Sequence, residues 1–187
     1  MGVRSSIERA VARAAFWPSV AWNHLLFRVV PGRRYWDAID EHVVMGAMPL
    51  EQHVAPLHAL GVRGVVNMCE EYGGPEASYA RLGMSQLRLP TIDFTAPSLE
   101  DVERGVAFIR AHAARGEKVY VHCKAGRARS ATVVLCWLIE RRGLSPEDAL
   151  AFMRSRRRQV LARLHRRAVV AEFIRANAAS QNAGRSA

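Results

Sequence analysis

The residues best suited to chemistry lie in one short segment, His122-Cys123-x5-Arg129-Ser130, with Gly126 between the cysteine and the arginine. In a chain this rich in arginine, a cysteine followed six positions later by an arginine would arise by chance roughly four times in ten. Requiring the histidine, the glycine and the serine as well lowers that chance to about one in ten thousand. The segment therefore predicts a functional site.

A strand-like run, Val119 to His122, leads into this segment, and an apolar helix-forming run leaves it at Arg129. A short loop between a strand and a helix can turn its backbone N–H groups inward, where they and the helix N-terminus bind an anion. Gly126 permits the tight backbone path. These amides, Arg129 and Lys124 favour the thiolate of Cys123, since cysteines in such surroundings have pKa values of about 3.5–7.5. Arg129 presents a planar fork for two phosphate oxygens, so the pattern predicts a nucleophile above a phosphate-binding loop.

From about Asp37 the chain alternates strand-forming and helix-forming segments. We expect strands at 42–48, 62–68, 84–89 and 118–122, and helices at 50–60, 76–82, 129–142 and 161–176. Two more helices begin at the capping residues Ser98 and Ser145. This alternation predicts an α/β fold with a mainly parallel central sheet flanked by helices. The helix after the loop is apolar on nearly all sides, so it is expected to be buried.

We expect three parts: a basic amphipathic segment (1–36), a catalytic domain (37–176) and a flexible tail (177–187). The first part contains six arginines, the single acid Glu8, and interleaved aromatic residues. That composition is typical of a mitochondrial transit segment or of a helix on a membrane surface. A basic amphipathic helix packed on the domain is an alternative of equal weight.

The 187-residue chain has 27 Lys and Arg against 17 Asp and Glu, a net charge of +10 that favours anionic partners. The three cysteines (Cys69, Cys123 and Cys136) are far apart, and the histidines lack metal-ligand spacing. We therefore expect no disulfide framework and no metal ion. No apolar run approaches the ~20 residues that would span a bilayer.

The segment around Cys123 resembles the signature of the cysteine-based protein tyrosine and dual-specificity phosphatases. The stretch HCKAGRARS is very similar to the loop of one group in the dual-specificity branch, the mitochondrial, protein tyrosine phosphatase-like enzymes that dephosphorylate phosphatidylglycerophosphate. Other stretches echo that group in the same order: VPGRRYWDAID, VVMGAMPL, NMCEEY, QLRLPTIDFT, KVYVHCKAGRARSAT and LSPEDAL. The resemblance covers about Ala15 to Ala176 and weakens after Met153.

The resemblance implies a two-step hydrolysis without metal or cofactor. Cys123 would attack phosphorus and form a phosphocysteine, while Arg129 and the loop amides hold the phosphate oxygens. Asp93 matches the family's general acid, which protonates the leaving group and then activates water. Ser130 would help the cysteine to leave, and His122 would shape the loop from behind it.

Substrate-binding residues are expected in two loops. The first supplies Lys124, Ala125, Gly126, Arg127 and Ala128, and the second supplies Glu70, Glu71 and Tyr72. Ligands of parallel sheets bind outside the carboxyl ends of the strands. Because Cys123, Asp93 and the second loop each follow a predicted strand, we expect them to meet at one edge. Solvated loop residues are the alternative for Asp93 and the second loop.

The resemblance implies phosphatidylglycerophosphate as substrate, a step in cardiolipin synthesis, with peripheral contact to an acidic membrane surface. The same loop would serve a dual-specificity protein phosphatase acting on phosphotyrosine or phosphothreonine, which is the main alternative. Nucleic acid is not expected, because no base-stacking aromatic residues cluster near the loop. A phosphate-binding module without activity would need no thiol. The expected location is the matrix side of the mitochondrial inner membrane in a eukaryote, and the cytoplasm or inner membrane in a bacterium.

Three further features remain open at this point. The basic run from Arg154 to Arg167 fits a solvated helix face, or contact with phospholipid or nucleic acid. Cys69 and Cys136 fit small buried residues. For Cys69, a disulfide with Cys123 is the alternative.

Overall fold

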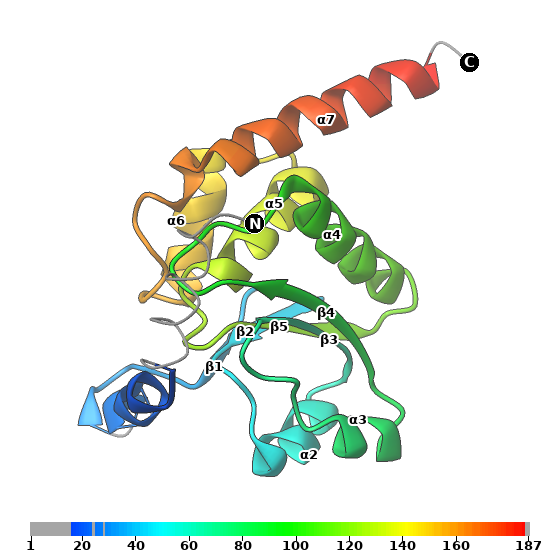
Figure 1. Ribbon diagram of the computed structural model, residues 1–187. Coiled ribbons are helices and arrows are strands. Elements are labelled where there is room, and N and C mark those ends of the chain that lie inside the picture. The colour runs from blue at the N-terminus through cyan, green and yellow to red at the C-terminus, as the bar shows by residue number, and fades with distance from the viewer. Residues whose placement is uncertain (1–15, 24, 28, 186–187) are drawn as a thin grey trace, which may run out of the picture.

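The computed structural model describes residues 16–23, 25–27 and 29–185, with side chains up to residue 179. Its centre is a five-stranded sheet with the order β1-β2-β5-β3-β4 (Figure 1). The strands are β1 (Trp36–Ala38), β2 (Val43–Gly46), β3 (Val62–Cys69), β4 (Ser85–Thr91) and β5 (Lys118–His122). All neighbouring strands run parallel except β1, which is antiparallel to β2. The prediction of a mainly parallel central sheet is confirmed.

Helices cover both faces of the sheet (Figure 1). One face carries α2 (Glu51–Ala59) and α3 (Glu76–Arg81), and the other carries α4 (Leu99–Ala113) and α5 (Arg129–Arg142). Beyond them lie α6 (Pro146–Arg156), a 3-10 turn η1 (Leu164–Arg166) and α7 (Ala168–Arg185), which contacts α4 and α5. The layers are those of an α/β fold.

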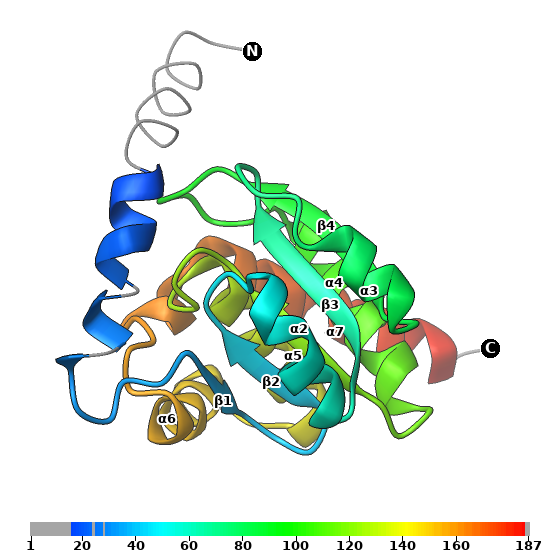
Figure 2. The same ribbon diagram turned by 90° about the horizontal axis from the view of Figure 1, so that it is seen from below.

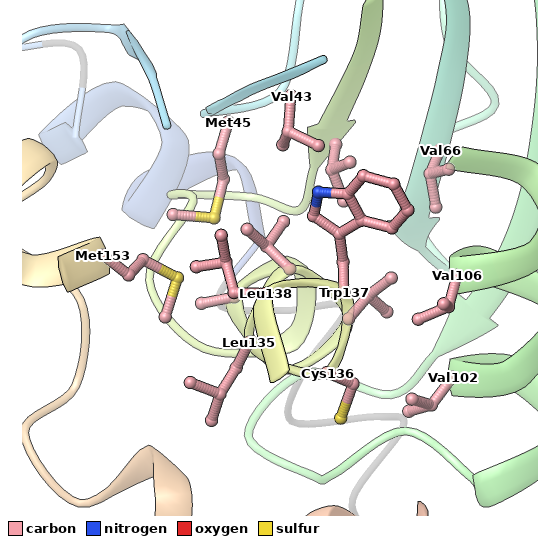
Figure 3. Close-up of a cluster of buried hydrophobic side chains, with 14 of the residues drawn as sticks. Val43, Met45, Val66, Val102, Val106, Leu135, Cys136, Trp137, Leu138 and Met153 are labelled. Carbon is pink, nitrogen blue, oxygen red and sulfur yellow. The ribbon is translucent and has the colours of Figure 1, made fainter. Parts of the chain in front are cut away.

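Alternation along the strands divides the core into two clusters. In β5, Val119 and Val121 pack with α4 and α5, whereas Tyr120 packs with α2 on the opposite face. This follows from the two-residue period of a strand that is covered on both sides. Figure 3 shows the larger cluster around Trp137 of α5, whose indole nitrogen donates a hydrogen bond to Asp40 Oδ2 over 2.8 Å. The predicted burial of α5 is confirmed.

The helix caps also follow the sequence. Ser98 and Ser145 each accept a hydrogen bond from the backbone N–H three residues later, at the starts of α4 and α6. Gly143 ends α5 in the left-handed conformation, with φ +61°, which glycine adopts at little cost. These signals explain why the predicted starts of α4 and α6 and the predicted bounds of α5 agree with the structure.

Two elements differ from the predictions. Strand β1 was not predicted, because three residues are too few to show a strand period. The helix expected over 161–176 is replaced by a loop, the short turn η1 and then α7, which continues to Arg185. The Leu161 N–H donates to the Arg127 carbonyl over 3.2 Å, so tertiary contact overrides the helical pattern there.

The N-terminal segment is helical over residues 16–23 and 25–27, and we call these residues the N-terminal helix. Phe16 and Val20 are buried against Met48, so this part of the segment packs on the domain. In Figure 2 it is the blue helix beside the edge at which the strand arrowheads end. Residues 1–15, which contain three of the six arginines of the basic segment, lie outside the described residues. Within the described part of the chain, no helix is long and apolar enough to cross a membrane.

Candidate active site

The sheet brings the predicted residues to one edge. His122, the last residue of β5, pairs with Gly46 of β2 and Asn67 of β3, and Cys69 pairs with Thr91. The four parallel strands therefore end side by side. The loops that follow β3, β4 and β5 carry Glu70–Tyr72, Asp93 and Cys123, as the sequence predicted.

The Cys123 side chain lies inside the loop between β5 and α5, and only 4% of this residue is exposed. Ser130 Oγ donates a hydrogen bond to its sulfur over 3.3 Å. Burial opposes ionisation of the thiol. The charge of Arg129, the Ser130 hydroxyl and the backbone amides of Ser130 and Arg127 outweigh burial and lower the pKa of Cys123 to about 6. At neutral pH most of this group is thiolate, the nucleophilic form.

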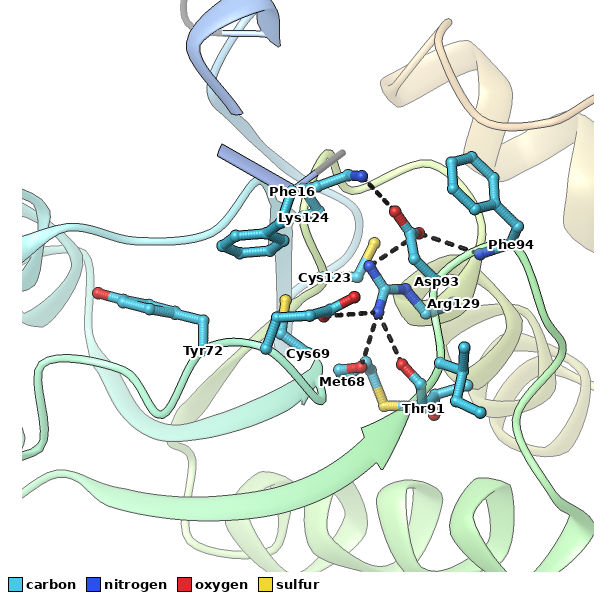
Figure 4. Close-up of polar contacts among 12 residues, drawn as sticks. Phe16, Met68, Cys69, Tyr72, Thr91, Asp93, Phe94, Cys123, Lys124 and Arg129 are labelled. Atoms are coloured by element: carbon cyan, nitrogen blue, oxygen red, sulfur yellow. Dashed lines mark hydrogen bonds and ion pairs between the residues drawn. The ribbon is translucent and has the colours of Figure 1, made fainter. Parts of the chain in front are cut away.

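The Arg129 guanidinium is buried and held by backbone from two strands. Its Nη1 donates to the carbonyl of Thr91 over 2.7 Å and to that of Met68 over 3.4 Å. The same nitrogen lies 3.4 Å from the carboxylate of Glu71. These contacts fix the plane of the guanidinium next to the thiolate (Figure 4).

Asp93 faces the two cations of the loop. Its Oδ1 lies 2.9 Å from Arg129 Nη2, and its Oδ2 forms an ion pair with Lys124 (Figure 4). The Lys124 ammonium, which we expected to favour the thiolate, is thus paired with the acid. A phosphate that binds the guanidinium of Arg129 through two oxygens must displace Asp93 from Nη2.

The phosphate-binding loop is held from behind by Arg157, which the sequence did not single out. The Arg157 side chain is fully buried, and it donates to the carbonyls of Gly126 over 2.9 Å and of Ala125 over 3.1 Å. Its Nη1 lies 2.7 Å from Asp37. Gly126 itself has φ +63°, and a Cβ there would collide with the Gly46 carbonyl and lie 2.8 Å from Arg157 Nη2. The requirement for glycine at this position is confirmed.

A pocket of about 390 Å³ opens above the thiolate. Asp93 and the loop residues 123–125 and 127–129 line it. Arg167 lines it as well, and so do four residues of the N-terminal helix. The basic run from Arg154 to Arg167 is therefore no uniform helix face, because Arg157 is buried behind the loop and Arg167 lines the pocket.

Six predicted site residues do not line this pocket: Gly126, Ser130, His122, Glu70, Glu71 and Tyr72. Burial lowers the pKa of His122 to about 3, so the ring is neutral behind the loop. The Tyr72 hydroxyl donates to the Pro49 carbonyl over 2.8 Å, and its ring points away from Cys123 (Figure 4). Cys69 is a free, buried thiol whose pKa is raised by burial, as expected of a small core residue.

A thiolate in a loop of backbone amides, with an arginine beside it and a carboxylate opposite, defines a cysteine-based phosphatase. Residues 44–175 match the family described as "Dual specificity phosphatase, catalytic domain", and the chain belongs to this family.

Similar proteins agree with this assignment. The chain is 42% identical over 169 residues to the phosphatidylglycerophosphate phosphatase PTPMT2 of Arabidopsis thaliana, covering 89% of this chain and 74% of the relative. It is 41% identical over 161 residues to human phosphatidylglycerophosphatase and protein-tyrosine phosphatase 1, covering 80% and 79%. The crystal structure of PTPMT1 in complex with PI(5)P superposes with a TM-score of 0.71 at 34% identity, covering 79% of this chain and 99% of that one.

Proposed function

We propose that this phosphatase hydrolyses the phosphomonoester of phosphatidylglycerophosphate to give phosphatidylglycerol. One observation carries the proposal: a single pocket combines the Cys123 thiolate, several cationic side chains and an apolar wall. The headgroup of phosphatidylglycerophosphate bears a terminal phosphomonoester and an inner phosphodiester, and it is attached to an apolar diacylglycerol.

The number of cations supports a substrate with two phosphate groups. Arg129 lies beside the thiolate, where it would hold the reacting phosphate, and Lys124 is paired with Asp93. Arg127 and Arg167 also line the pocket, and neither forms an ion pair with a carboxylate in the described part of the chain. They are suited to the inner phosphodiester. The relatives that carry this activity in their names support the same substrate.

In the first step, the Cys123 sulfur attacks phosphorus and the bond from phosphorus to the glycerol oxygen breaks. Arg129 and the loop amides stabilise the charge on the other phosphate oxygens. Once phosphate binding has displaced it from Arg129, Asp93 takes up a proton from solvent and gives that proton to the departing alkoxide. The products are phosphatidylglycerol and a phosphocysteine.

In the second step, water attacks the phosphocysteine and the sulfur–phosphorus bond breaks. Asp93, now a carboxylate, takes a proton from the water. The Ser130 hydroxyl, 3.3 Å from the sulfur, stabilises the departing thiolate. Inorganic phosphate leaves and the enzyme returns to its starting state.

The same proposal includes peripheral contact with an acidic membrane surface, since the substrate is a membrane lipid. The net charge of +10 supports that contact. In a eukaryote we place the enzyme on the matrix side of the mitochondrial inner membrane, and in a bacterium in the cytoplasm or at the inner membrane.

The decisive test compares phosphate release from three substrates: phosphatidylglycerophosphate in detergent micelles, a tyrosine phosphopeptide and p-nitrophenyl phosphate. We expect kcat/KM for the lipid to exceed that for the peptide at least tenfold. In addition, Arg167→Gln is expected to raise KM for the lipid, whereas Arg163→Gln, an exposed neighbour outside the pocket, is the matched control. Equal or reversed rates would favour a protein phosphatase instead.

A further inference from the structure

The N-terminal helix forms one wall of the active-site pocket. Ser19, Trp22, Asn23 and Leu26 line the pocket together with the loop around Cys123. Their spacing of three or four residues puts them on one side of the helix. The segment for which we expected a transit peptide, a helix on a membrane surface or a helix packed on the domain thus contributes directly to the site.

A second side of the helix fastens it to the domain. Phe16 and Val20 are buried, with 2% and 8% of each exposed, and they pack against Met48. Asn23 accepts a hydrogen bond from Arg33 over 3.1 Å, and the Phe27 ring lies 5.0 Å from that of Tyr35. The position of the helix beside the pocket is therefore set by packing.

The third side, which meets the pocket-lining side at Trp22, is exposed and apolar. Trp17, Trp22 and Leu25 are 62%, 61% and 48% exposed. The described residues of this helix, 16–23 and 25–27, include no acidic or basic side chain. Exposed apolar surface of this extent on a soluble domain marks an interaction site. Tryptophan is the residue most characteristic of the boundary between lipid and water.

Charge and location identify the partner. Phe94 and Leu161, 78% and 40% exposed, extend the apolar surface along the rim of the pocket. Next to it lies positive charge: Arg127 and Arg167 line the same pocket, and burial together with the nearby charge of Arg127 lowers the pKa of Arg33. An apolar surface beside clustered arginines is complementary to a bilayer that contains anionic lipids.

We propose that the exposed side of the N-terminal helix, formed by Trp17, Trp22 and Leu25, inserts into the surface of an anionic bilayer and turns the mouth of the active-site pocket toward the lipid. This inference rests on the proposed lipid substrate and assigns the surface through which it is reached. A lipid headgroup would then enter the pocket along the Trp22 and Leu26 wall without leaving the membrane.

The test uses the double variant Trp17→Ser, Leu25→Ser, because neither residue lines the pocket. The matched control is Leu60→Ser. Leu60 is 46% exposed and precedes β3, so it lies at the opposite edge of the sheet from Cys123. Co-sedimentation with vesicles of phosphatidylcholine and phosphatidylglycerol measures binding. Phosphate release is measured with phosphatidylglycerophosphate in the same vesicles and with soluble p-nitrophenyl phosphate.

We expect the wild type and Leu60→Ser to bind the vesicles, and the double variant to bind at least tenfold more weakly, since each inserted apolar side chain contributes to the affinity. Its activity on vesicle lipid should fall by a similar factor, with kcat/KM for p-nitrophenyl phosphate unchanged. Binding by the double variant equal to that of the wild type, or an equal loss in Leu60→Ser, would overturn the inference. If the wild type binds vesicles through this face but does not hydrolyse the lipid, the proposed substrate fails and the docking surface stands.

Discussion

The carboxylate of Asp93 and the guanidinium of Arg129, which both line the pocket, form an ion pair of 2.9 Å. Asp93 follows β4 and Arg129 begins α5, so the pair joins two loops at one edge of the sheet. A phosphate that binds Arg129 competes with Asp93 for the same nitrogen. In the proposed mechanism, substrate binding frees this carboxylate to take up a proton and pass it to the leaving oxygen, so the proton transfer depends on occupancy of the pocket.

Replacing Asp93 by Asn removes the transferable proton and keeps the side-chain shape. We expect kcat/KM for phosphatidylglycerophosphate to fall about 100-fold or more, the usual contribution of a general acid. The loss of kcat/KM for p-nitrophenyl phosphate should be far smaller, because kcat/KM reports the first step alone and this leaving group is stable as an anion. Steady-state phosphate release with both substrates measures this difference. Equal losses would contradict the acid role of Asp93.

The Cys123 thiolate makes stability depend on pH. Its pKa of about 6 lies below the value of about 8.5 for a free thiol, so folding favours the charged form. The contribution is complete above about pH 8.5 and is lost as the pH falls through about 6. The free energy of unfolding of the wild type should therefore rise by about 3 kcal/mol relative to Cys123→Ser between these limits. Urea unfolding of both proteins across this pH range measures it, and a constant difference would argue against a thiolate.

Gly126 is expected to tolerate no side chain. In Gly126→Ala the new Cβ collides with the Gly46 carbonyl, at φ +63°. Gly83 is the matched control, because it has φ +64° and a Cβ added there would meet nothing within 4 Å. Gly83→Ala should cost about 1 kcal/mol of stability from the left-handed conformation alone. Gly126→Ala should cost about 1–3 kcal/mol more and abolish vanadate binding. Similar losses in the two variants would show that space around Gly126 is not limiting.

Arg157 is expected to position the loop rather than touch substrate. In Arg157→Lys the positive charge stays near Asp37, but an ammonium cannot match the planar set of contacts to the Gly126 and Ala125 carbonyls. The loop amides would be less well oriented, so the pKa of Cys123 should rise and kcat/KM should fall about tenfold, equivalent to one lost hydrogen bond or more. The rate of Cys123 alkylation by iodoacetamide against pH reports the pKa directly. Arg158→Lys, an exposed neighbour, should leave the profile unchanged. An unshifted profile in Arg157→Lys would contradict the positioning role.

Most of the fold could be predicted because local signals agreed with one another. The α5 boundaries followed from an apolar run that begins after the loop and ends at Gly143, and Ser98 and Ser145 marked two helix starts. Strand β1 and the segment around Leu161 could not be predicted. Their conformations depend on partners distant in the sequence, a neighbouring strand for Trp36 and the Arg127 carbonyl for Leu161.

The site likewise contains some residues that the sequence predicts and others that only the structure reveals. Cys123, Arg129 and Asp93 could be found because their spacing and their places after strands carry the information. Arg157 and Arg167 were hidden in a run of similar arginines, and only the packed structure separates the buried one from the one that lines the pocket. For the N-terminal helix, composition suggested a membrane role or packing on the domain as alternatives. The described residues pack on the domain and still leave an apolar side exposed.

The most direct test of the account is the identity of the covalent intermediate. The enzyme is mixed with phosphatidylglycerophosphate in micelles, and the reaction is quenched within one turnover. The protein is then digested, and the masses of its peptides are measured by mass spectrometry. We expect one added phosphoryl group on Cys123 of the wild type and none in Cys123→Ser. In Asp93→Asn treated with p-nitrophenyl phosphate the amount should be larger, because attack of water on the phosphocysteine is slowed. A phosphoryl group on another residue, or full turnover by Cys123→Ser, would contradict the thiolate mechanism.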